Sequence, residues 1–233
     1  METLTERAID FFARNTPSPL TLATGGPPAF LWAYCCLRLA GWLKVGRGWK
    51  TGYTRKVFHF LIFGSVATVQ WRWGVSGVCL FGGMTSLVVF YAVYRGDGHP
   101  LYEAMAREQD APRRTYFILV PYFATLLGGL AGNILFGPTA LVGYLTTGFG
   151  DAVGEPVGTR FGRHRYRVPS LRGVPSTRSF EGSAAVCLAC AVAVAAALTL
   201  FDAWTLRGAA LVPAVALGAA FVEGVSPHGW DNA

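Results

Sequence analysis

Charged residues are scarce in this chain of 233 residues. Asp, Glu, Lys and Arg make up 14% of it, whereas ordinary soluble domains contain about 25%. Hydrophobic residues make up 52%, and this combination excludes an ordinary soluble domain and predicts a membrane protein. Serine- or proline-rich linkers, low-complexity tracts and fixed-period repeats are lacking as well, so we expect a single compact bundle.

The chain also lacks a cysteine framework and the basic start of a signal peptide. Its five cysteines all lie in apolar segments, where they are predicted to be small buried residues. Near the N-terminus, acidic and basic residues alternate with apolar ones, which is typical of a short helix on a membrane surface. We therefore divide the chain into an amphipathic or irregular segment, residues 1–27, and one integral-membrane domain, residues 28–233.

Apolar runs predict an all-α fold, a polytopic transmembrane bundle with about seven spans, because about 20 apolar residues cross the hydrocarbon core. The fifth run is short. It either continues as a helix through the glycine-rich stretch after it or enters the membrane as a re-entrant piece. The seven runs cover approximately residues 28–43, 57–71, 73–94, 115–136, 138–150, 183–201 and 208–222.

Lysine and arginine are distributed unevenly between alternate connections. Fifteen lie in the three loops 44–56, 95–114 and 160–178, and four lie in the opposite set. Cytoplasmic loops are enriched in these residues, so we expect the three loops at the cytoplasmic face and the N-terminus outside. A net charge of +7 that is concentrated in loops favours anionic ligands and membrane lipids as partners, and not nucleic acid.

The fifth run ends at two acids, Asp151 and Glu155, and at four glycines with the same spacing of four. On a helix this spacing places both carboxylates on one side, and the glycines form a ridge that another backbone or a ligand can approach closely. Paired carboxylates followed by arginines suggest a site for magnesium and polyphosphate; a solvated helix end is the alternative. Pro156 is expected to break or kink the helix. The glycines are Gly150, Gly154, Gly158 and Gly162.

Basic residues stand on both sides of these acids in the sequence. Arg55-Lys56 precedes His59 at the start of the second run; the pair is suited to phosphate and the imidazole to a further hydrogen bond. The alternative is the usual basic membrane boundary with a histidine satisfied inside the bundle. Arg163 and Arg165 follow the acids, in a loop whose alternative role is to bind lipid headgroups.

A further polar motif, Arg178 to Ser183, stands immediately before the sixth run. Ser179 is suited to cap that helix, with Glu181 and Gly182 in its first turn. A helix N-terminus near arginines is also an anion site, so capping and phosphate binding both remain open.

Two other stretches complete the polar inventory. At the C-terminal end, Glu223, Asp231 and Asn232 are expected at the same face as the other acids, where they would add carboxylates and an amide. Residues 46–51, with the sequence Gly-Arg-Gly-Trp-Lys-Thr, superficially resemble a phosphate-binding P-loop. The required spacing is missing, and we interpret this stretch as a basic loop.

These elements, taken in order, resemble the CTP-dependent polyprenol kinase family, which includes phytol kinases, dolichol kinases and the CTP-using diacylglycerol kinases of yeast type. They match R-K-x-x-H, G-D-x-x-x-[DE]-x-x-G, [KR]-S-x-E-G-S and E…S-P-x-G-x-D-N over residues 55–232. The resemblance implies transfer of the γ-phosphoryl group of CTP to a membrane isoprenoid alcohol such as phytol, geranylgeraniol or farnesol. It also implies Mg²⁺ or Mn²⁺ as cofactor, and a prokaryotic plasma (inner) membrane with the active site at the cytoplasmic face.

The resemblance implies that residues 28–233 form a catalytic domain. It also implies three groups of functional residues. The catalytic residues are Asp151, Glu155, Glu181 and His59. The metal ligands are Asp151, Glu155, Glu181 and Asp231. The residues that bind nucleotide and phosphate are Arg55, Lys56, Gly150, Gly154, Gly158, Arg163, Arg165, Arg178, Ser179, Gly182 and Asn232.

Three other activities compete with this interpretation. A CTP-dependent diacylglycerol kinase would use the same site on a different lipid. A CDP-lipid synthase would also join CTP to a lipid, but its late cluster of aspartates near a Gly-Gly pair is missing. A lipid transporter without enzymatic activity would carry its polar residues near the midplane of the bilayer, whereas here they gather at one rim.

Overall fold

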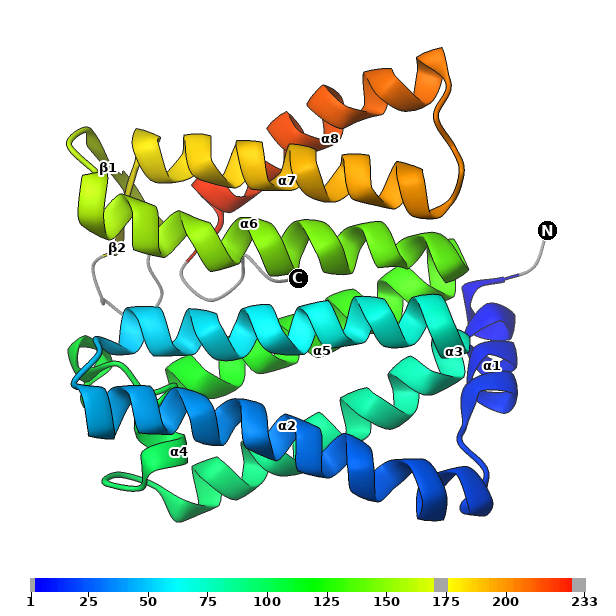
Figure 1. The fold of residues 1–233 in the computed structure, drawn as a ribbon, viewed down its shortest axis with the longest axis horizontal. Helices are drawn as coiled ribbons and strands as arrows, with labels where there is room; N and C mark the ends of the chain where they lie inside the picture. The colour runs from blue at the N-terminus through cyan, green and yellow to red at the C-terminus, as the bar shows by residue number, and fades with distance from the viewer. Residues whose placement is uncertain (1–2, 170–175, 228–233) are drawn as a thin grey trace.

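The computed structural model describes residues 3–169 and 176–227, and most of them are helical. The long helices run side by side and alternate in direction, with short connections at both ends (Figure 1). The elements in chain order are α1 (Leu4–Asn15), α2 (Pro19–Arg47), α3 (Thr51–Arg95), α4 (Pro100–Glu103), η1 (Glu108–Asp110), α5 (Tyr116–Phe136), η2 (Gly137–Thr139), α6 (Ala140–Phe161), β1 (Arg165–Val168), β2 (Ser176–Ser179), α7 (Phe180–Leu200) and α8 (Leu206–Val225).

All seven predicted apolar runs lie in helices, so the helical fold class is confirmed. The second and third runs both belong to α3, which turns back at Gly74 (Figure 1). Gly74 has φ of +68°, a left-handed conformation that glycine adopts without the steric penalty of a Cβ atom. The short turn η2 separates α5 from α6 in the same way, so that the chain passes repeatedly between the two ends of the bundle.

Four helical stretches in the described part of the chain are long and apolar enough to cross a membrane. They are Thr51–Arg95, Tyr116–Phe161, Phe180–Leu200 and Leu206–Val225. The first two, of 45 and 46 residues, contain the reversals at Gly74 and η2 and therefore hold two predicted runs each. Their length and composition indicate a membrane protein; the count of seven spans and the orientation remain predictions.

Helix α6 settles the open question about the fifth run. It continues without interruption for 22 residues and includes both acids and Pro156. The predicted break at Pro156 is therefore wrong. The helix has partners on two sides at this level, ion pairs from α3 and close backbone packing from α7, and these contacts hold the segment in helical geometry although proline lacks an N–H to donate.

A two-stranded antiparallel hairpin, β1 and β2, departs from the predicted all-helical fold. Arg165 pairs with Ser179 and Val168 with Ser176, so the arginine-rich loop folds back onto the start of α7. The sequence prediction missed these strands because charged and turn residues hide the alternation of Tyr166 and Val168, which are the less exposed side chains of β1.

The two ends of the bundle differ in chemistry. The end that carries α4, β1 and β2 collects the three basic loops, whereas α1 lies across the opposite end, where α3 reverses and α5 ends (Figure 1). A core of buried side chains from α2, both halves of α3 and residues 101–106 joins the two ends; it includes Leu37, Val88, Leu101 and Tyr102. This core fixes the start of α3 against the loop that follows α3, which matters for the site below.

Candidate active site

The first carboxylate of α6, Asp151, contacts the basic motif at the start of α3. Lys56 Nζ donates a short hydrogen bond to Asp151 Oδ1, and both side chains are nearly buried, with 5% and 8% of their surface exposed. His59 Nε2 lies 3.5 Å from Asp151 Oδ2 and 3.3 Å from the carbonyl oxygen of Thr147. Lys56 and His59 are one helical turn apart, so they meet Asp151 from the same side of α3.

The second carboxylate, Glu155, contacts two arginines. Arg55 Nη2 donates to Glu155 Oε2 at 2.9 Å, and Arg107 Nη1 donates to Glu155 Oε1 at 3.3 Å. A Cβ atom at Gly52 would lie 2.8 Å from Glu155 Oε1, so the glycine leaves the space that this carboxylate occupies. Lys56 Nζ, 3.7 Å from Glu155 Oε2, connects the two acids into one charged cluster.

Arg107 belongs to the loop between α3 and α5, and sequence reasoning missed it. Arg114 holds this loop in place: Nη2 donates to Glu103 Oε2 at 2.6 Å and to the Ala106 carbonyl at 2.8 Å, and Nε donates to the Arg107 carbonyl at 3.3 Å. Burial raises the pKa of Glu103, but hydrogen bonds from Arg114 and from the Gly98 N–H outweigh burial, so this pKa lies below its usual value. The ionised pair therefore keeps Arg107 beside Glu155.

A polar hollow of about 460 Å³ opens on the Glu155 side of this cluster. The first turn of α3, Arg107 and basic side chains from the preceding loop line it, and helix N-termini favour anions. The stretch 46–51, interpreted above as a basic loop, supplies part of the wall. The lining residues are Lys44, Gly48, Trp49, Lys50, Thr51, Gly52, Tyr53, Arg107, Glu108, Gln109, Glu155, Pro156 and Thr159.

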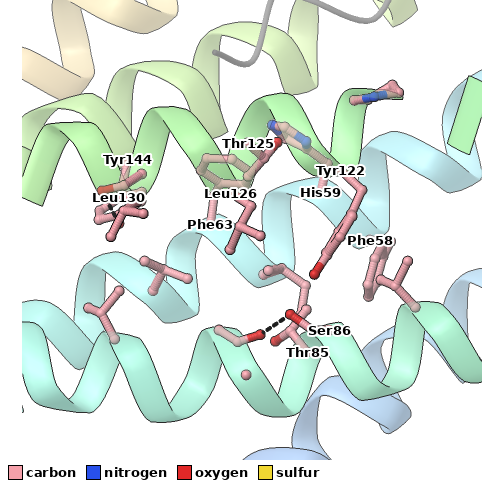
Figure 2. Close-up of a pocket in the computed structure, with 18 of the residues that line it drawn as sticks. Phe58, His59, Phe63, Thr85, Ser86, Tyr122, Thr125, Leu126, Leu130 and Tyr144 are labelled. Atoms are coloured by element: carbon pink, nitrogen blue, oxygen red, sulfur yellow. Dashed lines mark hydrogen bonds between the residues drawn. The ribbon is translucent and has the colours of Figure 1, made fainter. Parts of the chain in front are cut away.

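An apolar slot of about 260 Å³ opens on the Asp151 side. Side chains from both halves of α3 and from α5 point into it, with Leu130 and Tyr144 at the end away from Phe58 (Figure 2). On α5 its lining extends from Phe117 to Asn133, about 24 Å at the rise of an α-helix. The slot therefore has room along most of the roughly 30 Å of a hydrocarbon core, and Lys56, His59 and Asp151 line it at the charged end.

The two carboxylates thus separate two cavities of opposite character. Asp151 lines the apolar slot and Glu155 lines the polar hollow, one helical turn further along α6. Lys56 of α3 contacts both acids, whereas Arg55 of α3 and Arg107 of the following loop contact Glu155. Such an arrangement is suited to hold an anionic, water-soluble reactant on one side and an oily reactant with a polar head on the other.

Asp151 and Glu155 by themselves supply only part of a metal site. In the described residues, no group of three or more His, Cys, Asp or Glu side chains is arranged to hold a metal, so an all-protein cage is not formed there. Mg²⁺ commonly uses one or two carboxylates together with substrate phosphates. Asp151 and Glu155 are candidates for these carboxylates. Asp231, the predicted fourth ligand, and Asn232 lie outside the described residues.

The predicted glycine ridge packs against α7. Cβ atoms built at Gly150 and Gly154 would lie 2.7 Å from side-chain atoms of Cys190 and Val186, and one at Gly158 would lie 3.0 Å from Ser179 Oγ. The sequence allowed either another backbone or a ligand to approach these glycines. In the structure the backbone of α7 packs against them. Small residues at such a contact let two membrane helices pack closely.

The remaining predicted site residues lie on the α7 side of α6. Ser179 Oγ accepts from the Gly182 N–H at 3.1 Å, so the capping role is confirmed. Arg178 forms an ion pair with Glu223, and Glu181 Oε1 lies 2.8 Å from His164 Nδ1. Arg163 and Arg165 are exposed. The structure therefore divides the predicted site: Arg55, Lys56, His59, Asp151 and Glu155 come together, and the Arg178 to Gly182 motif forms separate contacts.

Fold and site together define a class, a helical membrane protein with a charged cluster at one end of an apolar slot. Over 183 residues the chain is 28% identical to phytol kinase from Synechocystis sp., and the match covers 77% of this chain and 72% of that protein. No protein-family model matches the chain, and no solved structure matches it. The similarity supports a protein like the phytol and polyprenol kinases.

Proposed function

We propose that this protein is a lipid-alcohol kinase that transfers the γ-phosphoryl group of CTP to an isoprenoid alcohol of the membrane. The observation that carries the proposal is the position of Asp151, Lys56 and His59 at the charged end of the apolar slot. An alcohol with a long apolar chain fits such a site, with the chain in the slot and the hydroxyl group beside Asp151. The similarity to phytol kinase supports the same reaction class.

The donor is assigned to the polar hollow. Its lining contains Lys44, Lys50 and Arg107 together with the first turn of α3, and these groups favour a triphosphate. Trp49 supplies an aromatic wall of the kind on which nucleobases stack. With the nucleobase of CTP in the hollow, the γ-phosphate would point toward Glu155 and toward Lys56, which contacts both Glu155 and Asp151.

In the proposed reaction the alcohol oxygen attacks the γ-phosphorus, the bond from this phosphorus to the β-γ bridging oxygen breaks, and CDP leaves. Asp151, the carboxylate that lines the slot, accepts the hydroxyl proton. Arg55, Lys56 and Arg107 neutralise charge on the transferred group, which is the main requirement of phosphoryl transfer. Asp151 and Glu155 would hold Mg²⁺, which neutralises phosphate charge when it is bound. His59, whose Nε2 atom lies 3.5 Å from Asp151 Oδ2, would help to orient this carboxylate.

The test uses purified protein in lipid nanodiscs with CTP that is radiolabelled at the γ-phosphate, and with phytol, geranylgeraniol, farnesol, dolichol and diacylglycerol as acceptors. We expect label in an isoprenoid phosphate, release of CDP, and loss of the reaction when EDTA removes divalent metal. Preferential labelling of diacylglycerol would favour the diacylglycerol kinase alternative. Release of pyrophosphate in a parallel reaction with phosphatidate as the acceptor would indicate a CDP-lipid synthase, and the absence of any labelled lipid with CTP would refute the kinase.

A further inference from the structure

A side chain of α1 lines the apolar slot, and α1 lies across the end of the bundle away from the charged cluster (Figure 1). Phe11 lines the slot and only 8% of its surface is exposed, whereas its neighbour Phe12 is 53% exposed. The other large apolar residues of α1, Leu4 and Ile9, are exposed as well. Helix α1 therefore directs one large apolar side chain inward and the others outward, toward the position of surrounding lipid.

Helix α1 is well placed to form a fixed end of the apolar slot. Its N-terminus is closed by a capping box, in which Thr3 Oγ1 accepts from the Glu6 N–H at 3.2 Å and Glu6 Oε2 accepts from the Thr3 N–H at 2.7 Å. The helix lies across the end of the bundle where α3 reverses (Figure 1). Phe11 is thus held at the limit of the space that an acceptor chain would occupy.

Polar side chains line the slot toward the same end (Figure 2). Asn133 and Tyr144 both line the slot, and Asn133 Nδ2 donates to Tyr144 OH at 2.6 Å and to the Gly129 carbonyl at 2.8 Å. Gln70 Nε2 donates to Asn133 Oδ1 at 3.0 Å. A hydrogen-bonded network of this kind resists displacement by an alkyl chain, because breaking it would leave buried polar groups unpaired.

The width of the slot depends on a glycine of α3. Gly82 lines the slot, and no described atom lies within 4 Å of a Cβ built there. A Cβ atom at this position would meet no described atom, so a larger side chain is expected to extend into the space of the slot. Gly64, on the other half of α3, also has no described atom within 4 Å of a built Cβ, but it is outside the lining of the slot.

We propose that Phe11 is the end-stop that sets the length of the acceptor chain and that Gly82 keeps the slot open at intermediate depth. This inference rests on the proposed lipid-alcohol kinase activity and adds the residues that select among its substrates. An acceptor that fits between Asp151 and Phe11 places its hydroxyl group at the carboxylate. A longer chain meets Phe11 before its hydroxyl group arrives there.

The test measures kcat/KM for prenols of increasing length, from geraniol through farnesol and geranylgeraniol to longer polyprenols. We expect Phe11→Ala to raise the ratio of longer to shorter acceptors at least about tenfold, which corresponds to about 1.4 kcal/mol. Phe12→Ala is the matched control and should keep the wild-type profile. Phe11→Leu provides a milder truncation, with a smaller shift in the same direction, if the alanine variant folds poorly.

The second arm narrows the slot. Gly82→Leu should reduce kcat/KM for long prenols more than for short ones, whereas Gly64→Leu should leave the profile unchanged. If the wild type phosphorylates prenols and Phe11→Ala and Phe11→Leu both keep its length profile, the end-stop is wrong and the kinase proposal stands. If the wild type phosphorylates no alcohol, the proposed function fails and this inference fails with it.

Discussion

The two sides of α6 each carry key residues at a spacing of four, but one side forms ion pairs and the other packs against a helix. On the side toward α3, Asp151 and Glu155 stand four residues apart and form ion pairs with Lys56 and Arg55. On the side toward α7, glycines with the same spacing, among them Gly154, allow the close approach of a second helix. A spacing of four identifies a face of a helix, but the chemistry of the face depends on the residues that the neighbouring helix brings to it.

The largest effect is expected on the charged side. Asp151→Asn keeps the shape of the side chain and removes the proposed proton acceptor, so kcat should fall by roughly 10²–10⁴-fold, the usual contribution of a general base. The measurement is transfer of label from CTP to a prenol, with size-exclusion chromatography in detergent to establish that the variant is folded. Activity within a few-fold of wild type would remove Asp151 from the mechanism.

A smaller loss is expected at Arg107, which connects the loop after α3 to Glu155. Hydrogen bonds from charged groups contribute about 1.5–3 kcal/mol, so Arg107→Gln should raise KM for the nucleotide roughly 10- to 100-fold. The matched control is Arg95→Gln, because Arg95 bonds to the exposed Tyr91 on its own helix. Equal effects of the two substitutions would show that Arg107 has no special role toward the donor.

On the glycine side we expect a loss of stability. Gly154→Leu forces a side chain against Val186, and overpacking of this kind typically costs about 1–3 kcal/mol. Gly143→Leu is the control on the same helix, since no described atom lies within 4 Å of a Cβ built there, and both changes gain similar helix propensity. Thermal unfolding in detergent should show a lower Tm for Gly154→Leu alone; similar Tm values would contradict the packing role.

The smallest effect is expected at Glu181, which contacts the exposed His164. An exposed pair contributes about 0–1 kcal/mol, so Glu181→Gln should change kcat by less than about threefold. The same assay of label transfer measures it. A loss as large as that of Asp151→Asn would instead place Glu181 in the reaction and unite the two sides of α6 in one site.

The helices were predictable because they depend on local patterns, and the approach of α3 to α6 was expected from the distribution of basic residues and from the family resemblance. Apolar runs of sufficient length gave the helices, and the motif with Arg55 and Lys56 does meet Asp151 and Glu155. The fold of the basic loop 160–178 was not predictable, since its strands are short and rich in charge. The sequence also left open whether α6 continues past Pro156, because contacts from two neighbouring helices stabilise this continuation.

Arg107 and residues 48–51 belong to the site, but the sequence did not predict their contribution. Their contribution depends on the reversal of α3 at Gly74, which returns the chain to the charged end, and on Arg114, which holds the following loop against Glu103. Arg107 and Glu155 are 48 residues apart in the chain, and local spacing contains no information about such tertiary contacts. The uneven distribution of basic residues was the one signal that pointed to loop 95–114.

The hollow and the slot have no lining residue in common among those described. Under the proposed function, a reactant dissolved in water and a reactant dissolved in oil would therefore each have an entrance of its own. Neither would obstruct the path of the other, so the enzyme would form a ternary complex in either order of addition, and excess lipid would not compete with the nucleotide.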